Sequence, residues 1–333
     1  MRTAALLPLA LTSIPTVSAW GALGHSTVAF IAQNLVAPQT ATWVKNILGV
    51  TTSTYLVDVS SWADSYRSQA GGGFTSPFHF IDAQDSPPTS CNVDYNRDCT
   101  SSGCVVSAIA NYTRRVTTTS LSKTERDYAL RFIVHFLGDV HQPLHNENYA
   151  LGGNDVDVTF AGSDRNLHGI WDTQIPERLR GASYTVDEAK AWAAELTTDV
   201  KSGAYASSAA SWKIVDTEDA VNQALKWSNE ANDYVCTVVA PKGWTAVQSG
   251  DLATNGYYAS VTSTIELQIA RAGVRLAAWL DQLSGAATSA KRDETPFDLQ
   301  GRDLLPPTSR VTRAQLARRA AGAGCGCGEH AHE

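Results

Sequence analysis

The stretch Arg126-Asp-Tyr-Ala-Leu-Arg-Phe-Ile-Val-His-Phe-Leu137 decides the fold class of this chain. Its apolar residues recur at three- and four-residue spacing, which is the period of an amphipathic α-helix. Four other segments have the same spacing, whereas strand patterns are few. We therefore predict an all-α chain with helices over Val28–Val36, Arg126–Leu137, Ala189–Val200, Ala220–Val235 and Ser260–Leu283.

A few segments depart from the helical pattern. Residues 155–160 alternate between polar and apolar side chains after Gly152 and Gly153, which predicts a small hairpin. Residues 91–104 are cysteine-rich and are expected to form a loop. Asp187 precedes an apolar helical segment, and we expect it to cap that helix.

The two ends of the 333-residue chain differ from its body. Residues 1–19 have a basic start, a short apolar run and the small-residue sequence Val17-Ser18-Ala19, as in a secretory signal. A buried N-terminal helix is the alternative. Composition changes near Ser284, and a dibasic pair at 291–292 begins a proline-containing tail. We expect a signal peptide at 1–19, one domain at 20–285, and a flexible extension or propeptide at 286–333.

Cysteine usage agrees with export, because even sets of cysteines in exported proteins favour disulfides. Cys99 and Cys104 are close enough to close a small loop, and Cys91 and Cys236 would then join distant segments. Asn111 begins a glycosylation acceptor, which predicts an exposed loop or helix end. No stretch after residue 19 is long and apolar enough to cross a membrane. We therefore expect a secreted, extracellular, monomeric glycoprotein.

Histidine and aspartate pairs recur at helical spacing. His135 with Asp139, and His168 with Asp172, stand at i and i+4, which places each pair on one helix face. Nitrogen and carboxylate ligands of this kind suit zinc. The alternative is a set of buried histidines bonded to neighbouring carboxylates. Further candidate donors are His25, Asp64, His79, His145 and, once Ala19 is removed, the α-amine and carbonyl of Trp20.

The order of these motifs resembles the fungal zinc-dependent single-strand-specific nucleases and 3′-nucleotidases of the S-one/P-one type. The resemblance extends from Trp20 to about Leu283. It rests on the segments Trp20–His25, Ser61–Asp64, Phe78–Asp82, His135–Asp139, Gln142–His145 and Asn166–Asp172.

The resemblance implies a single, mainly helical domain with a trinuclear zinc cleft, related to zinc-dependent phospholipase C. It implies a secreted endonuclease that hydrolyses single-stranded DNA and RNA to 5′-phosphate products and also acts on 3′-mononucleotides. An acidic chain with net charge −7 does not bind nucleic acid by counterion release alone. The three Zn²⁺ ions that the resemblance implies would supply the local positive charge that phosphate binding needs.

The resemblance also assigns ligands to three zinc ions. One ion is held by Asp64, His79, His135 and Asp139, and a second by Trp20, His25 and the shared Asp139. A third is held by His145, His168 and Asp172. Bound zinc would supply an activated water for attack on phosphorus, and Arg67 matches a family arginine near the cluster that would stabilise charge on the phosphoryl group.

Phe80, Asp82 and Asn154 match the base pocket of the family. An aromatic face stacks on any base, and Asp82 accepts hydrogen bonds from a base edge. A paired base must unpair to enter, which favours single strands. Each of these residues has a structural alternative: Phe80 as core, Asp82 as a turn cap, Asn154 as a turn residue and Arg67 as the partner of a surface ion pair. The family pattern also implies the disulfides Cys91–Cys236 and Cys99–Cys104.

Some residues depart from the family pattern. His141 is not a ligand there and is expected at a helix end. Ser163 and Gln174 stand where tyrosines of a second nucleotide site are expected. The tail residues 325–332 contain Cys and His that offer a peripheral metal site. Competing interpretations are a phospholipase C, which the base pocket disfavours, and a non-catalytic zinc-binding protein, which the shared Asp139 disfavours.

Overall fold

The computed structural model describes residues 20–288 of the chain. The predicted signal peptide, the dibasic pair and the Cys- and His-containing tail lie outside the described residues, so the domain limits stay predictions. Within the described part, no helix combines the length and the apolar character that crossing a membrane requires.

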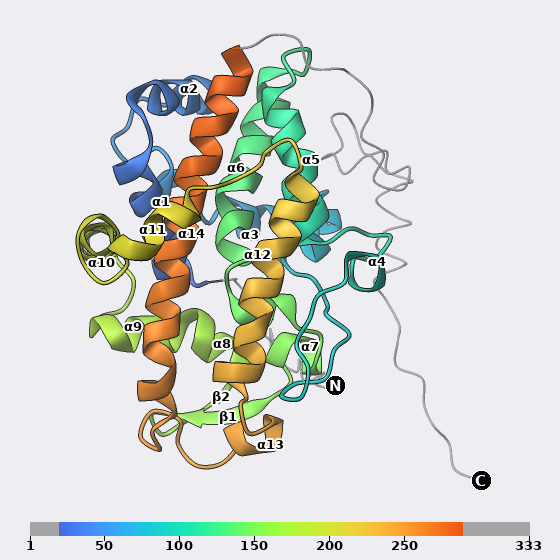
Figure 1. Cartoon of the computed structure of the whole chain (residues 1–333), viewed down its shortest axis with the longest axis vertical. Coiled ribbons are helices and arrows are strands. Elements are labelled where there is room, and N and C mark those ends of the chain that lie inside the picture. Colours follow the sequence, from blue (N-terminus) through green and yellow to red (C-terminus); the bar gives the residue numbers. More distant parts are fainter. Residues whose placement is uncertain (1–19, 289–333) are drawn as a thin grey trace, which may run out of the picture.

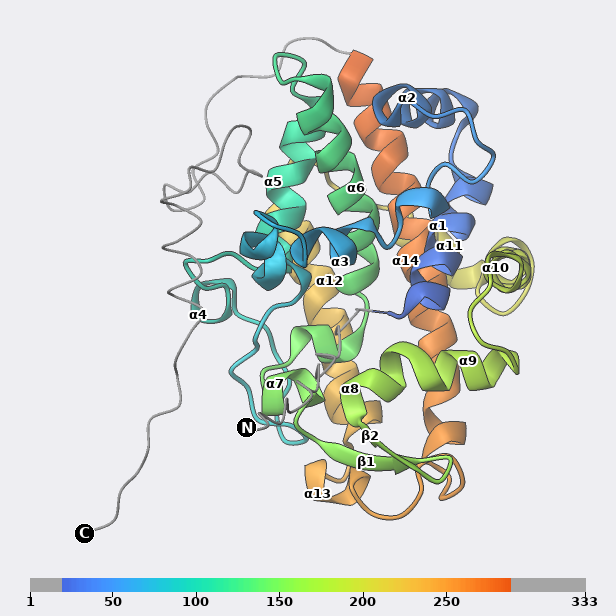
Figure 2. The ribbon, with the colours of Figure 1, turned by 180° about the vertical axis from the view of Figure 1, so that it is seen from behind.

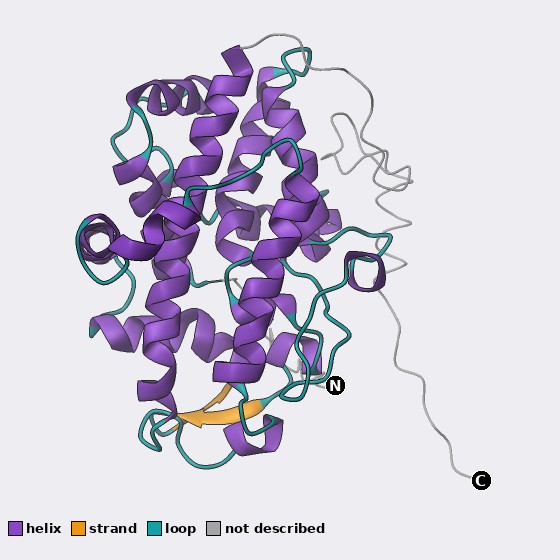
Figure 3. Ribbon diagram, viewed as in Figure 1, coloured by secondary structure: helices purple, strands orange, loops and turns teal. Residues whose placement is uncertain are grey.

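Long helices packed side by side dominate the structure (Figure 1; Figure 3). The longest, α14, runs along the molecule and packs against α1, α2, α6, α10 and α11. The helices of more than ten residues are α1 (Ala22–Leu35), α2 (Pro38–Leu48), α5 (Val105–Thr117), α6 (Lys123–Asp139), α10 (Val186–Lys201), α12 (Ala220–Tyr234) and α14 (Tyr257–Thr288). The predicted all-α class and all five predicted helices are confirmed.

Short helical segments connect the long ones. The α-helical ones are α3 (Trp62–Arg67), α4 (Tyr95–Asp98), α7 (Ala150–Gly153), α8 (Leu167–Gly169), α9 (Ile175–Arg180), α11 (Ala206–Trp212) and α13 (Trp244–Val247). Three tighter 3₁₀ turns are η1 (Val57–Val59), η2 (Gly73–His79) and η3 (Pro143–Asn146). Two wider π turns are η4 (Ile170–Gln174) and η5 (Val235–Val239). Several of these short segments carry donor residues of the site described below.

The predicted hairpin is confirmed. Strand β1 (Asp157–Phe160) pairs antiparallel with β2 (Ser163–Asn166), with Asp157 opposite Asn166 and Phe160 opposite Ser163. Ala161 and Gly162 form the turn, both with positive φ. The hairpin lies at one end of the bundle (Figure 3), and β2 leads directly into α8.

Local sequence signals explain where several helices begin and end. Helix α6 begins with a capping box, in which the Ser122 hydroxyl accepts from the Glu125 amide and the Glu125 carboxylate accepts from the Ser122 amide. Helix α2 begins at Pro38 and ends at Leu48, and Gly49, with a left-handed φ of 68°, caps it. These signals are consistent with the apolar periodicity that predicted the helices.

Two local predictions are wrong, and a third, the loop at 91–104, is right except for one short helix. Thr185, not Asp187, caps α10, because the Thr185 hydroxyl accepts from the Glu188 amide. The expected loop at 91–104 contains the short helix α4, which Asp94 caps. Asn111 does not lie in an exposed loop or at a helix end; it lies inside α5 with 5 % of its surface exposed. Glycosylation of Asn111 itself stays a prediction.

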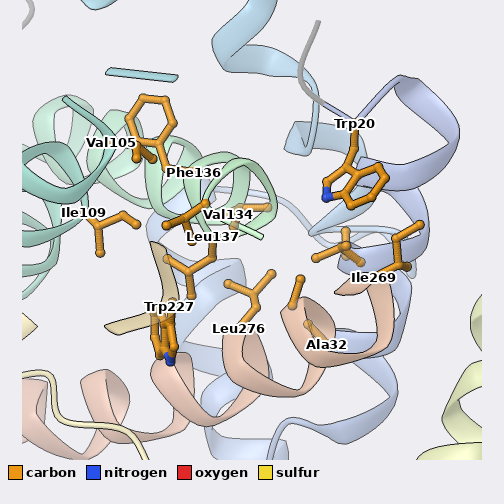
Figure 4. Close-up of a cluster of buried hydrophobic side chains, with 14 of the residues drawn as sticks. Trp20, Ala32, Val105, Ile109, Val134, Phe136, Leu137, Trp227, Ile269 and Leu276 are labelled. Carbon is orange, nitrogen blue, oxygen red and sulfur yellow. The ribbon is translucent and has the colours of Figure 1, made fainter. Parts of the chain in front are cut away.

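The apolar core lies between α1, α5, α6, α12 and α14 (Figure 4). Phe136 and Leu137 of α6, Ile109 of α5 and Leu276 of α14 are fully buried in it. Helices α1 and α14 approach closely at Gly273, where a Cβ would lie 2.5 Å from the Ile31 side chain. The bundle thus holds the N-terminal helix firmly against its longest helix.

Two disulfides join parts of the described chain. Cys91–Cys236 connects the segment before α4 to η5, across 145 residues of sequence, and Cys99–Cys104 closes a short loop before α5. Both pairings agree with the expectation from the sequence.

Candidate metal centre

The C-terminal end of α6 is the centre of the donor residues. Asp139 is its last residue, and His135 lies one turn earlier; both side chains are fully buried. Helix α3 crosses in front of α6, with α1 beside it, as Figure 2 shows. This crossing brings Asp64 of α3 and His25 of α1 to the end of α6.

Asp139 contacts three histidines from three elements. Its Oδ1 lies 3.2 Å from His25 Nε2, and its Oδ2 lies 3.0 Å from His79 Nδ1 and 3.3 Å from His135 Nε2. A carboxylate surrounded in this way is suited to bridge two cations.

A second set of contacts joins α3 to the same end of α6. Asp64 Oδ1 lies 3.6 Å from His135 Nε2 and 3.7 Å from His79 Nδ1. His135 Nδ1 donates to the Ser60 carbonyl at 2.7 Å, so Nε2 of a neutral His135 carries the lone pair and faces the carboxylates. A second ring hydrogen bond of this kind is typical of metal-binding histidines.

The third set of donors comes from short elements. His145 lies in η3, His168 in α8 and Asp172 in η4, and all three are buried. The two histidine Nε2 atoms are 3.1 Å apart, and Asp172 Oδ2 lies 3.1 Å from His168 Nε2. The donor atoms of three groups each lie within 4.8 Å of one another: His25, His135 and Asp139; Asp64, His79 and His135; and His145, His168 and Asp172.

The hydrogen bonds of the third group test whether it suits a cation. His145 Nδ1 donates to the His79 carbonyl and His168 Nδ1 donates to the Gly152 carbonyl, each at 2.7 Å. Since a carbonyl only accepts, both neutral rings have their lone pairs on Nε2. Two lone pairs and a carboxylate oxygen therefore face one another, an arrangement that a cation balances. In the first group, Nδ1 of buried His25 has no hydrogen-bond partner among the described residues, and Nε2 faces Asp139 Oδ1.

The N-terminal segment lies against the third group. The Trp20 side chain is fully buried, and the Gly21 amide donates to the Asp172 carbonyl at 2.7 Å. A Cβ on Gly21 would lie 2.7 Å from Thr173 Oγ1, so this contact needs glycine. Every donor of the three groups comes from the part of the chain before residue 173.

Burial and neighbouring charges shift the pKa values of the buried histidines in opposite directions. Burial lowers the pKa of His135, but the charges of Asp139 and Asp64 outweigh it and raise this pKa to about 9. Burial, and then the charge of His168, lower the pKa of His145 to about 4. Burial raises the pKa of Asp139, but the charge of His135 and several hydrogen bonds hold it well below its usual range. Asp139 is therefore an anion at neutral pH.

Comparison with known proteins agrees with this geometry. Residues 20–285 match the family described as S1/P1 Nuclease. The chain is 51 % identical to Nuclease P1 of Penicillium citrinum over 268 residues, which cover 80 % of this chain and 98 % of that protein. It is 51 % identical to Nuclease PA3 of a Penicillium species, with the same coverage. It is 46 % identical to Nuclease S1 of Aspergillus oryzae over 283 residues, covering 84 % of this chain and 98 % of that protein.

The chain belongs to the S1/P1 nuclease family.

The expected substrate residues of this S1/P1 nuclease family member stand close in the sequence to residues that contact the donor groups: Phe80 and Asp82 follow His79, and Asn154 follows Gly152. Phe80 directly follows His79, is half-buried, and its carbonyl accepts from the Val105 amide at 2.9 Å. Burial and the charge of Asp98 raise the pKa of the partly exposed Asp82. Asn154 is partly exposed, and its amide donates to the Leu151 carbonyl at 2.8 Å, which is the turn role considered as its alternative. Arg67 Nη2 lies 3.2 Å from Asp64 Oδ1, beside the second group.

Residues that depart from the family pattern belong to none of the three donor groups, although Gln174 shares η4 with Asp172. His141 is buried at the end of α6, donates from Nδ1 to the Leu137 carbonyl, and accepts at Nε2 from Arg275 at 2.9 Å. Ser163 begins β2 and Gln174 ends η4.

Sequence reasoning missed residues that support the S1/P1 donors. The Gln142 side chain is fully buried and donates to Asp172 Oδ1 at 2.7 Å. Gly138 lies where a Cβ would be 2.8 Å from His25 Nδ1. Both residues stand inside or beside the motifs that were recognised, so their proximity to ligand positions was the available signal.

Proposed function

We propose that this protein is a secreted, monomeric endonuclease that uses three Zn²⁺ ions to hydrolyse single-stranded DNA and RNA. Its products would have 5′-phosphate ends, and it would also hydrolyse 3′-mononucleotides. The observation that carries the proposal is the convergence of buried and partly buried His and Asp donors into three groups, two of which share His135. Membership of a nuclease family supports the phosphodiester substrate.

The ligand assignment follows the three groups. Asp64, His79, His135 and Asp139 would hold one ion, and His145, His168 and Asp172 another. The second ion would be held by His25, Asp139 and Trp20, the last through an α-amine that removal of residues 1–19 exposes. The close contact of His25 with His135, whose rings stack at 4.0 Å, is consistent with neighbouring first and second ions.

Bound zinc supplies a water with a pKa near neutrality and a Lewis acid for the phosphoryl oxygens. The chain's own residues orient this chemistry. Asp139 keeps two donor groups together, and the guanidinium of Arg67, held beside Asp64, reaches toward charge on the phosphoryl group. Three divalent ions exceed the charge of the three aspartates, so an acidic protein offers phosphate a positive cleft.

The base pocket explains the single-strand preference. Partly exposed Phe80 offers an aromatic ring, Asp82 a hydrogen-bond acceptor, and Asn154 a polar group directly after α7. A base within a duplex is already stacked and must leave its partner before it enters, which costs a few kcal/mol.

The first experiment uses secreted protein whose N-terminus is verified as Trp20. It is incubated with single-stranded DNA, double-stranded DNA and phosphatidylcholine, each with and without a chelator. Rapid, chelator-sensitive loss of the single strand alone supports the proposal. Cleavage of lipid with intact DNA would indicate a phospholipase, and zinc binding without any turnover would leave a metal-binding protein.

The pocket is tested by Asp82→Ala. This variant should keep its zinc but hydrolyse mononucleotides more slowly, because the base loses its acceptor. Asp94→Ala is the matched control, since Asp94 is an exposed carboxylate of the same segment that caps α4 and touches no donor residue. Full mononucleotide activity in Asp82→Ala would exclude the pocket assignment.

A further inference from the structure

Gln142 lies at the junction between the donor groups but belongs to none of them. It is fully buried and follows α6 by three residues. Its amide donates to the Asp139 carbonyl at 2.9 Å, and its carbonyl accepts from the His145 amide at 3.0 Å. The backbone of Gln142 therefore connects the last residue of α6 to the turn that carries His145.

The orientation of the Gln142 side chain is fixed by its neighbours. Its Oε1 accepts from the Leu144 amide at 2.5 Å. Because a backbone amide only donates, the oxygen of the side chain must face Leu144, and Nε2 must face the opposite way. Nε2 then donates to Asp172 Oδ1 at 2.7 Å.

This hydrogen bond determines which oxygen Asp172 offers. Oδ1 is occupied by Gln142, whereas Oδ2 lies 3.1 Å from His168 Nε2, among the atoms of the third group. The position of the Asp172 backbone is also constrained. Asp172 lies in the single π turn η4, and the Asp172 carbonyl accepts from the Gly21 amide. A neutral amide holds the carboxylate without adding a competing charge.

We propose that Gln142 is a positioning residue for the third donor group, which sets the rotation of the Asp172 carboxylate and the position of His145 together. The proposal rests on the proposed function, because it concerns the zinc site that Asp172 would complete. Outer residues that orient ligands typically change metal affinity about 10–100-fold when they are replaced.

Gln142→Glu and Gln142→Met test the proposal. The first keeps an acceptor for Leu144 but turns a carboxylate toward Asp172, and the second keeps the length but removes both hydrogen bonds. Gln268→Glu is the matched control, because Gln268 is equally buried and its side-chain hydrogen bonds, to the His141 carbonyl and from Arg271, involve no donor residue. Zinc affinity is measured by competition with a chelator, and thermal stability is measured with and without Zn²⁺.

We expect both Gln142 variants to bind one zinc ion about 10–100-fold more weakly while the others remain. Their loss of thermal stability should be larger with zinc than without it, and Gln268→Glu should retain full zinc affinity. Wild-type zinc affinity in both variants overturns the proposal. An equal loss of stability with and without zinc, or failure to fold in saturating zinc, also overturns it, because Gln142 would then act only in folding. If the wild-type protein binds no third zinc ion, the proposed function fails instead.

Discussion

The two His-x₃-Asp pairs have the same spacing but different supports. His135 and Asp139 lie on α6, a helix of 17 residues packed within the core, and both side chains are fully buried. His168 and Asp172 lie on a three-residue helix followed by a π turn. Regular helix geometry spaces the first pair, and one hydrogen bond, to the Ser60 carbonyl, orients the His135 ring. The second pair depends on single hydrogen bonds to Gly152, Gly21 and Gln142.

The difference shows that two pairs of donors with equal spacing in the sequence can be held in position by very different numbers of contacts. Donors on a long helix are fixed by many backbone hydrogen bonds at once, so each one matters little. Donors on short turns depend on a few contacts, and each contact should have a measurable effect on metal binding.

Removing one histidine from each pair should have the largest effect. His135 takes part in two donor groups and His168 in one. We therefore expect His135→Ala to lose more zinc than His168→Ala and to reduce hydrolysis of single-stranded DNA by more than about 100-fold, beyond the range for outer-shell residues. Zinc content per chain and rates on the same substrate measure this. Equal zinc loss in the two variants would contradict the central role of α6.

Replacing glycines beside the donor groups by alanine should have an intermediate effect on stability and zinc binding. In Gly138→Ala the new Cβ lies 2.8 Å from His25 Nδ1, and in Gly152→Ala it lies 2.6 Å from the Leu144 carbonyl at a φ of +61°. Overpacking of this kind costs about 1–3 kcal/mol. We expect Gly138→Ala to lower the free energy of unfolding and weaken zinc binding at His25, and Gly152→Ala to displace the acceptor of His168. Gly73→Ala is the control, because its Cβ meets no atom closer than 3.9 Å.

The smallest expected effect concerns the pH dependence of stability in the zinc-free protein. The contributions of His135 and His145 to the free energy of unfolding should change with pH in opposite directions. The pKa of His135 is raised to about 9, so its stabilising contribution is complete below its unfolded pKa of about 6.5 and is lost as pH rises through 9. The pKa of His145 is lowered to about 4, so its contribution is complete above 6.5 and is lost as pH falls toward 4.

Melting temperatures of the zinc-free protein across this pH range measure the effect. His135→Gln should flatten the alkaline side of the profile and His145→Gln the acid side. Profiles that keep the wild-type shape in both variants would show that these two histidines do not govern the pH dependence.

The sequence predicted the parts of the structure that depend on periodicity. The long helices follow from apolar spacing, and the pair on α6 follows from helix geometry, so both were accessible without the fold. The hairpin was also accessible, because alternation and turn residues act locally. The capping of α10 by Thr185 was missed because Asp187 is an equally plausible cap by residue type alone.

Features of the site that depend on tertiary contacts could not be predicted from the periodicity of the sequence. His25, Asp64 and His79 have no common spacing with α6, and only the family resemblance placed them together. The burial of Asn111 was missed because its sequon says nothing about the face of α5 on which it lies. Gln142 was missed as a support because its role depends on the fold bringing Asp172 to it.

The position of the donors has a consequence for how this chain can vary. All of them precede residue 173, whereas α10, α11, α12 and α14 pack behind them and contribute none. Random substitutions in the first half should therefore abolish chemistry in many soluble, well-folded chains. Substitutions in the second half should instead have one of two outcomes. They are tolerated, or they destabilise the fold so that little protein accumulates. Surface residues of the later helices can therefore be substituted, by evolution or by design, without loss of the reaction.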